Sequence, residues 1–190
     1  MKQARRAFLL EIPEAPMTTA QAFLRHARFR LSEDYAVKIS GALAELTDEQ
    51  IWWRPNDASN SIGNLILHLC GNIRQWMIAG VSGATDQRDR DREFTERRPL
   101  GKDKLLALMH ATLSEVDAVL AELEAETISN ADAPLQRRVV PQGFAQTVLD
   151  SVFHVVEHFS YHTGQIVFIG KLLVAQRIRF YDDRQLDVRG

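Results

Sequence analysis

The side chains with the clearest chemical potential in this chain are histidines near its carboxyl end. His154, His158 and His162 recur at intervals of four and are followed directly by a Thr-Gly-Gln sequence. Side chains four residues apart stack along one face of a helix, so His158 and His162 can direct their rings at a common point. Two imidazoles that face one point can bind one metal ion.

The three histidines cannot easily share one ion. His154 and His162 would lie about 12 Å apart along a helix axis, the outer limit for two rings that place nitrogens about 2 Å from one ion. We therefore expect one pair to bind, and the third histidine to lie beside it or to have another role. The alternative interpretation is a set of core histidines hydrogen-bonded to backbone or carboxylate groups.

A metal ion held by two histidines needs a further ligand, and His68 is the candidate. It belongs to a stripe of neutral polar side chains at helical spacing, made of Ser61, Asn64, His68, Asn72 and Gln75. A face exposed to bulk water more often carries Lys and Glu, so this stripe predicts a cavity wall or a polar interior. The alternative is a weakly solvated surface with an incidental histidine.

The remaining histidines and the cysteine indicate no second site. His26 and His110 have no histidine or carboxylate partner at ligand spacing, and we expect them at the surface or at its boundary. Cys70, the one cysteine, lies beside an apolar stripe, where a small buried hydrophobe is the favoured role. A single cysteine excludes a disulfide framework and Cys-based zinc fingers, and it favours a reducing, cytoplasmic setting.

Four segments with helical periodicity must position these side chains. Apolar residues recur at spacings of three and four over about 17–46, 62–77, 103–125 and 147–176, and no strand-like alternation extends beyond a few residues. The sequence therefore predicts an all-α fold. The longer helices would span about 30 to 45 Å, which suits a four-helix bundle. Apolar residues around nearly the whole axis of the last helix predict that it is buried on most sides.

Two connections separate the later helices. Residues 81–102 are mixed-charge with few apolar side chains and are expected to form a long solvated connection. Their 22 residues, at up to about 3.3 Å each, could return the chain to the same end, so a crossover bundle is allowed. Residues 126–146 contain two prolines, and 136–140 could pair with 144–147 in a small hairpin.

Length and composition indicate one soluble globular domain. The chain has 190 residues, 45% hydrophobic and 25% charged, with a formal charge of −2. We expect a core over about 17–176, with tails at 1–16 and 177–190. No apolar run reaches the roughly 18 residues of a membrane span, and Glu11 ends the amino-terminal apolar stretch too early for a signal peptide. The near-neutral net charge of the chain disfavours nucleic acid as a partner. The arginines of 88–98 do not change this, because they alternate with acidic residues that largely cancel their charge.

Four motifs occur in a fixed order. They are NSIGNLILHL at 60–69, GNIRQW at 71–76, RDRDREF at 88–94 and EHFSYHTGQ at 157–165. Together they resemble the DinB-like (DinB/YfiT) superfamily of small helical metalloproteins, and most closely its DUF1572 branch. The resemblance implies a four-helix bundle of up-down-down-up topology, with a long crossover between helices two and three. It also implies a metal triad of His68, His158 and His162, with His154 outside the triad.

The resemblance further implies homodimers, and other branches of the superfamily transfer or rearrange low-molecular-weight thiol conjugates at the metal. Three neutral imidazoles leave positions open on an ion, as in catalytic sites, and zinc, nickel or iron would suit them. Gln165 could bond to a ligand or substrate, and Glu157 is a weaker candidate for a general base. We therefore expect a metal-dependent enzyme acting on small thiol conjugates, or a hydrolase. The alternative is a non-catalytic, metal-stabilised binding or regulatory module.

Overall fold

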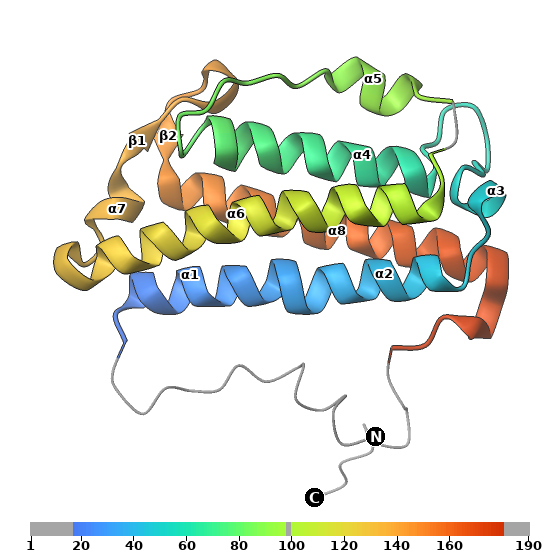
Figure 1. Cartoon of the computed structure of the whole chain (residues 1–190), viewed down its shortest axis with the longest axis horizontal. Coiled ribbons are helices and arrows are strands. Elements are labelled where there is room, and N and C mark those ends of the chain that lie inside the picture. The colour runs from blue at the N-terminus through green and yellow to red at the C-terminus, as the bar shows by residue number, and fades with distance from the viewer. Residues whose placement is uncertain (1–16, 98–99, 181–190) are drawn as a thin grey trace, which may run out of the picture.

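Four long helical segments lie side by side in the computed structural model, which describes residues 17–97 and 100–180 (Figure 1). The first is continuous through α1 (Thr19–Phe29), the π-helix η2 (Arg30–Tyr35) and α2 (Ala36–Ala44). The others are α4 (Ile62–Ile73) with the π-helix η3 (Arg74–Ala79), α6 (Lys102–Asn130) and α8 (Val148–Val174). The short helices are α3 (Asp48–Ile51), α5 (Arg90–Thr95) and α7 (Ala133–Gln136). The predicted all-α class is confirmed.

Local sequence signals set most helix starts. Four helices begin with a capping box, at Thr18, Thr47, Ser61 and Thr147. In each, the hydroxyl of the cap accepts a hydrogen bond from the N3 backbone N–H, and the N3 side chain accepts one from the backbone N–H of the cap. Helix α6 extends five residues beyond the predicted end near 125, because neither glycine nor proline occurs before Pro134. The small hairpin is present as β1 (Arg138–Val139) paired antiparallel with β2 (Gln146–Thr147).

The apolar core lies between the four long segments. Helix α8 packs against α4 and against α2, while α6 packs against α1 and α4. Aliphatic side chains from every segment are fully buried there, among them Leu24, Ile39, Ile66, Leu105 and Val155. Each such burial contributes about 1.5 to 3 kcal/mol, so the core sets the spacing at which α4 and α8 face each other. No helix of the described residues is long and apolar enough to cross a membrane.

Most described residues of the connection 81–102 are exposed, as its composition predicts, but the segment is also ordered against the bundle. It runs along α4 and contains α5 (Figure 1). Glu93 is buried, and the Arg88 side chain is only 4% exposed. The amide of Asn64 on α4 donates to the backbone carbonyls of Glu93 and Glu96, at 2.9 and 3.2 Å. Within this charged run, Arg88 and Glu93 can be buried because they pair with each other and because the polar stripe of α4 provides further partners.

Helix α8 also differs from its prediction, because it is not buried on most sides. Four large apolar side chains on it are each more than half exposed: Phe153, Tyr161, Phe168 and Leu172. Its neighbours α4 and α2 cover only part of its circumference. We call these four side chains the outer row of α8.

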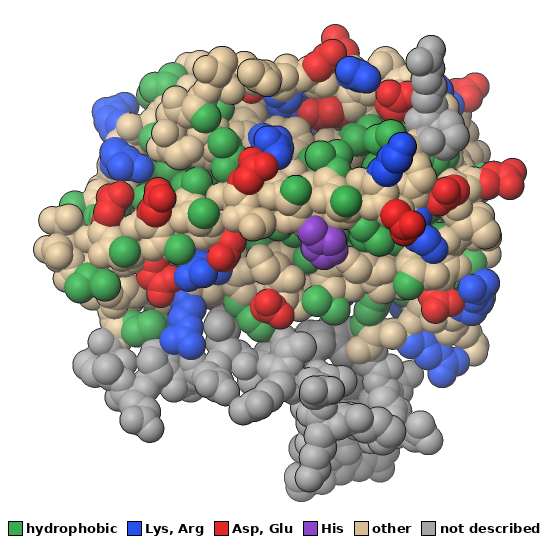
Figure 2. Space-filling model, in the orientation of Figure 1, with side chains coloured by type: hydrophobic (Ala, Val, Ile, Leu, Met, Phe, Trp, Pro, Cys, Tyr) green, Lys and Arg blue, Asp and Glu red, His purple; other side chains and the backbone are tan. Residues whose placement is uncertain are grey.

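The chain beyond α8 contributes to the core, past the predicted boundary at 176. After η5 (Ala175–Arg177), Ile178 is buried and packs close to Gly170. The expected tail at 1–16, and 181–190 of the second expected tail, lie outside the described residues. On the face shown in Figure 2, acidic and basic side chains are interspersed, in keeping with the near-zero net charge.

Candidate metal centre

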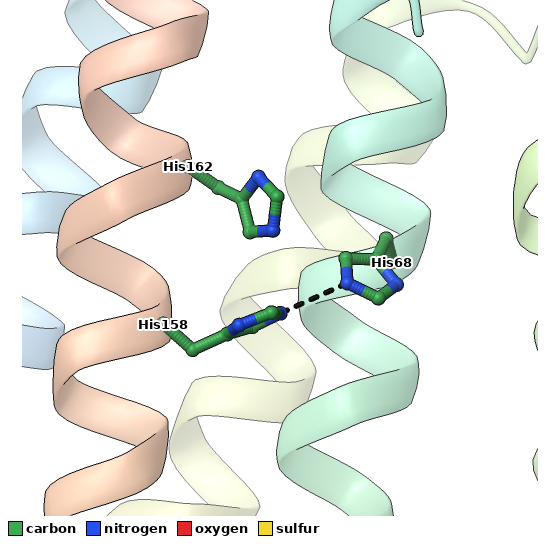
Figure 3. Close-up of side chains that lie close together, drawn as sticks. All are labelled: His68, His158 and His162. Atoms are coloured by element: carbon green, nitrogen blue, oxygen red, sulfur yellow. Dashed lines mark hydrogen bonds between the residues drawn. The ribbon is translucent and has the colours of Figure 1, made fainter.

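Three imidazole rings from two helices meet between α4 and α8 (Figure 3). His68 extends from α4, and His158 and His162 extend from successive turns of α8. Each ring offers a nitrogen within 4.8 Å of the other two, and the rings of His68 and His162 are buried while that of His158 is half-buried. The tertiary fold thus brings together the three histidines singled out from the sequence.

Two of the rings face each other at a distance typical of metal ligands. Nε2 of His68 lies 2.9 Å from Nε2 of His158. Two nitrogens bound at about 2.1 Å to one ion lie about 3 Å apart when they subtend a right angle. The ring of His162 is 5.0 Å from that of His68 and 4.5 Å from that of His158, centre to centre. The cluster therefore could hold one metal ion.

Hydrogen bonds at the far side of two rings fix which nitrogen faces the cluster. Nδ1 of His68 lies 2.9 Å from a carboxylate oxygen of Glu93, and Nδ1 of His162 lies 2.7 Å from the side-chain oxygen of Gln165. Both oxygens only accept, so each Nδ1 carries the hydrogen and each Nε2 keeps a lone pair. Such outer hydrogen bonds orient metal-ligating histidines. Gln165 thus bonds to His162 itself, whereas the sequence interpretation assigned it to a ligand or substrate.

Glu93 is held in turn by Arg88. The guanidinium donates from Nε and Nη2 to the two carboxylate oxygens, at 2.7 and 2.8 Å, and from Nη1 to Gln75 at 2.8 Å. Burial alone would raise the pKa of the Glu93 carboxyl, but the hydrogen bonds from Arg88 and His68 hold that pKa below its ordinary value. The group facing His68 is therefore an ionised carboxylate.

Gly71 makes room for this carboxylate. It lies three residues after His68 on the same side of α4, and a Cβ at Gly71 would overlap the carboxylate of Glu93. Sequence reasoning missed Glu93 and Arg88, because an alternating run of acidic and basic residues is typical of solvated loops. The available signal was the uncharged stripe of α4 with a glycine inside it, which left space for a polar partner.

The rings on α8 are neutral near physiological pH. Burial, and then the neighbouring imidazoles, lower the pKa of His158 to about 3, and burial lowers the pKa of His162. A neutral His158 can donate its Nε2–H to Nε2 of His68 at 2.9 Å, or carry its hydrogen on Nδ1 and offer a second lone pair beside that of His68. In the second tautomer the three nitrogens form a donor set that fits a cation.

His154 lies beside the cluster rather than in it. Its ring stacks on Trp76 with a centre-to-centre distance of 3.8 Å, and its Nε2 lies 3.2 Å from the amide nitrogen of Asn72. Glu157 is exposed and lies outside the cluster. These positions leave the three converging histidines as the candidate ligands.

The other sequence candidates lie away from the centre. His26 and His110 are exposed, as expected. Cys70 is buried, and burial raises the pKa of its thiol to about 12, which is consistent with a hydrophobic role.

Aromatic side chains flank the cluster. The ring of Phe94, from α5, lies 4.7 Å from the ring of His68, and the ring of Tyr161 lies 5.0 Å from that of His162. Tyr161 is 63% exposed, so the cluster is close to the surface at the outer row of α8. Two of the three candidate ligand rings therefore each have an aromatic neighbour.

Comparison with known proteins agrees with the resemblance at the level of the family. A family model described as a protein of unknown function (DUF1572) matches residues 18–181, a range that includes the three histidines, Glu93 and Gln165. A comparison with curated proteins finds no match.

Proposed function

The chain belongs to the DUF1572 family, and from this premise we propose that it binds one divalent metal ion through His68, His158 and His162. The carrying observation is the pair of Nε2 atoms at 2.9 Å on His68 and His158. The acceptors on Nδ1 of His68 and His162 support it, because they direct ligand lone pairs into the cluster. Imidazole ligands suit zinc or nickel, and also iron.

We further propose that the protein is a metal-dependent enzyme that acts on small thiol conjugates, in the manner of an S-transferase, or that it is a hydrolase. A bound ion would lower the pKa of a water or thiol ligand toward neutrality. The chain's own residues would orient the reaction: Glu93 and Gln165 hold two of the ligand rings, and Phe94 and Tyr161 offer apolar contacts to a substrate. Three protein ligands, with one ring half-buried, leave an approach for that substrate.

We propose in addition that the chain belongs to the wider DinB-like superfamily and has its up-down-down-up bundle topology. The path of the chain in Figure 1 supports this topology. The segment α1 to α2 runs in one direction and α4 returns; the connection through α5 then crosses the length of the molecule, so that α6 runs parallel to α4 before α8 reverses.

A contrasting function is a non-catalytic module in which the ion only joins two helices. The cluster favours this alternative in one respect, because its ligands come from α4 and α8 and an ion would tie these helices together.

Metal removal distinguishes the two functions. Tag-free protein would be assayed with glutathione or cysteine and monochlorobimane for S-transfer, and with p-nitrophenyl acetate for hydrolysis. The enzyme proposal predicts that chelation abolishes turnover and that zinc or nickel restores it, while the His162→Ala variant stays folded and inactive. A chelated protein that loses only thermal stability, with no turnover in either form, would establish the structural ion instead.

We also propose that the outer row of α8 is covered by a second copy of the chain. Phe153, Tyr161, Phe168 and Leu172 are each more than half exposed, and the resemblance implies homodimers. Light scattering after size exclusion should show a dimer that Phe168→Glu converts to a monomer. Val37→Glu is the matched control, because Val37 is 53% exposed on α2, and that variant should stay dimeric. A wild-type monomer would refute this proposal.

A further inference from the structure

A polar cavity lies on the side of α8 that faces η2, roughly opposite the histidine cluster. Its volume is about 940 Å³, within the range of pockets that bind small molecules. Helix α8 contributes Ser160, Thr163, Gly164, Val167 and Lys171 at helical spacing, and the opposite walls come from η2, α2 and residues 175–180.

The walls of this cavity are held by close packing. Ile178 seals one end against Gly170, where an added Cβ would lie 2.6 Å from Ile178 Cδ1. Phe180 packs against Gly41, where an added Cβ would lie 3.2 Å from its ring. Gly164, in contrast, faces open space, since a Cβ there would meet nothing within 4 Å. Gly164 therefore borders the cavity.

The charge of the lining is strongly positive. Four basic side chains line it, Arg30, Lys38, Lys171 and Arg179, and no acidic side chain of the described residues does. Buried Asp34 lies behind two of them and forms ion pairs of 2.5 Å with Arg30 and Lys38. Even with one charge neutralised by Asp34, an excess of positive charge remains around the cavity, which favours an anion.

Hydroxyl groups at the cavity wall point to the same kind of ligand. Thr163 is only 4% exposed, and its Oγ1 has no hydrogen-bond partner among the described residues, which is unfavourable unless a ligand supplies one. The hydroxyl of Tyr35 accepts two hydrogen bonds from Arg30, at 3.0 and 2.8 Å, so its own hydrogen is available to another acceptor. Both residues line the cavity. The two hydroxyl groups are therefore an observation separate from the basic side chains of the lining.

We propose that this cavity binds a small organic anion, a phosphate or carboxylate attached to an apolar group. Lys171 and Arg179 supply charge, Thr163 and Tyr35 supply hydrogen bonds to the anionic oxygens, and Ile178 and Phe180 provide an apolar wall. A π-helical turn at η2 lines the site, as such turns often line functional sites. The proposal does not rest on the metal function.

Calorimetric titration of the full chain at low salt tests this site with phenyl phosphate as the probe and benzyl alcohol as its neutral analogue. Phenyl phosphate should bind at least about tenfold more tightly than benzyl alcohol, and more weakly as salt is added. The double variant Lys171→Ala/Arg179→Ala should lose about tenfold or more in affinity. Arg92→Ala is the matched control, because Arg92 is exposed on α5 and does not line this cavity.

The buried hydroxyl gives a second, independent readout. Thr163→Val keeps the shape of the side chain and should weaken phenyl phosphate by about threefold to tenfold, whereas Thr163→Ser should bind like the wild type. Equal affinity for benzyl alcohol, or unchanged affinity in the double variant, would overturn the anion site. Equal affinity for inorganic phosphate would overturn the organic part of the proposal.

Discussion

Helix α8 presents two polar faces with opposite demands. Toward α4 it carries His158 and His162, whose ring nitrogens converge with that of His68. Toward η2 it carries Thr163 and Lys171, which border a cavity with an excess of basic side chains. One face presents imidazole nitrogens that can offer lone pairs, and the other presents donors and positive charge. A single helix can thus serve a cation on one side and an anion on the other.

The difference lies in how each face is supported. The histidine face is backed by a buried, ionised carboxylate, since Glu93 accepts from His68 and is neutralised by Arg88. On the cavity face the one buried carboxylate, Asp34, lies behind Arg30 and Lys38. A carboxylate beyond an imidazole strengthens it as a metal ligand, whereas a carboxylate behind basic side chains orders them and leaves net positive charge in front.

The largest effect should come from removing a ligand on the histidine face. His68→Ala or His162→Ala should abolish stoichiometric metal, because the site loses one of three converging nitrogens. Elemental analysis of tag-free protein measures this directly. His26→Ala, at an exposed position on α1, should keep its metal. Full metal content in His68→Ala would break the proposed site.

A smaller effect should follow from disturbing the carboxylate behind that face. Gly71→Ala places a Cβ where Glu93 lies, and the displaced carboxylate should cost about 10- to 100-fold in metal affinity. Competition with a chelating dye measures the loss. Gly164→Ala is the control, because its Cβ meets nothing within 4 Å, and its metal affinity should equal that of the wild type. Equal affinity in both variants would show that Glu93 does not support His68.

Acid should lower the free energy of unfolding of the metal-free protein through its histidine cluster, at pH values above those at which carboxylates titrate. The pKa of His158 falls to about 3 in the folded protein, so below the ordinary histidine pKa of about 6.5 the unfolded chain binds more protons. The free energy of unfolding of chelator-treated protein should therefore be fully developed above about pH 6.5 and decline as pH falls toward 3.

Denaturant unfolding at pH 7.5 and pH 5 measures this decline, at values that stay above the ordinary carboxyl pKa values of about 4. His158→Gln should flatten the dependence, since glutamine does not titrate. Identical stability of the wild type at the two pH values would contradict a depressed pKa in the cluster.

The smallest effect should be the influence of one face on the other. Lys171 lies nine residues from His162, about 13 Å along α8, which exceeds the screening length of about 8 Å at physiological salt. Lys171→Ala should therefore change metal affinity by no more than about twofold, and His162→Ala should leave phenyl phosphate affinity equally unaffected. A tenfold change in either direction would show that the two faces form one coupled site.

Much of the helical framework is predictable from the sequence because its causes are local. The spacing of apolar residues and the capping hydroxyls of Thr18, Ser61 and Thr147 act within a few residues, so the long helices lie close to where periodicity places them. Two features were missed for local reasons. Helix α6 continues past 125 because no helix breaker follows, and the charged run around α5, most of it exposed as predicted, gives no local sign that Arg88 and Glu93 are buried.

By itself, the sequence determined which side chains share a helical face: His158 with His162, and His68 with the neutral stripe of α4. Only the tertiary structure decided that these two faces meet, that the connection folds back so Glu93 reaches His68, and that η2 brings Arg30 and Lys38 against the other side of α8. The reason is physical. Periodicity arises from backbone geometry over a few residues, whereas the pairing of groups 25 to 90 positions apart depends on how whole helices pack.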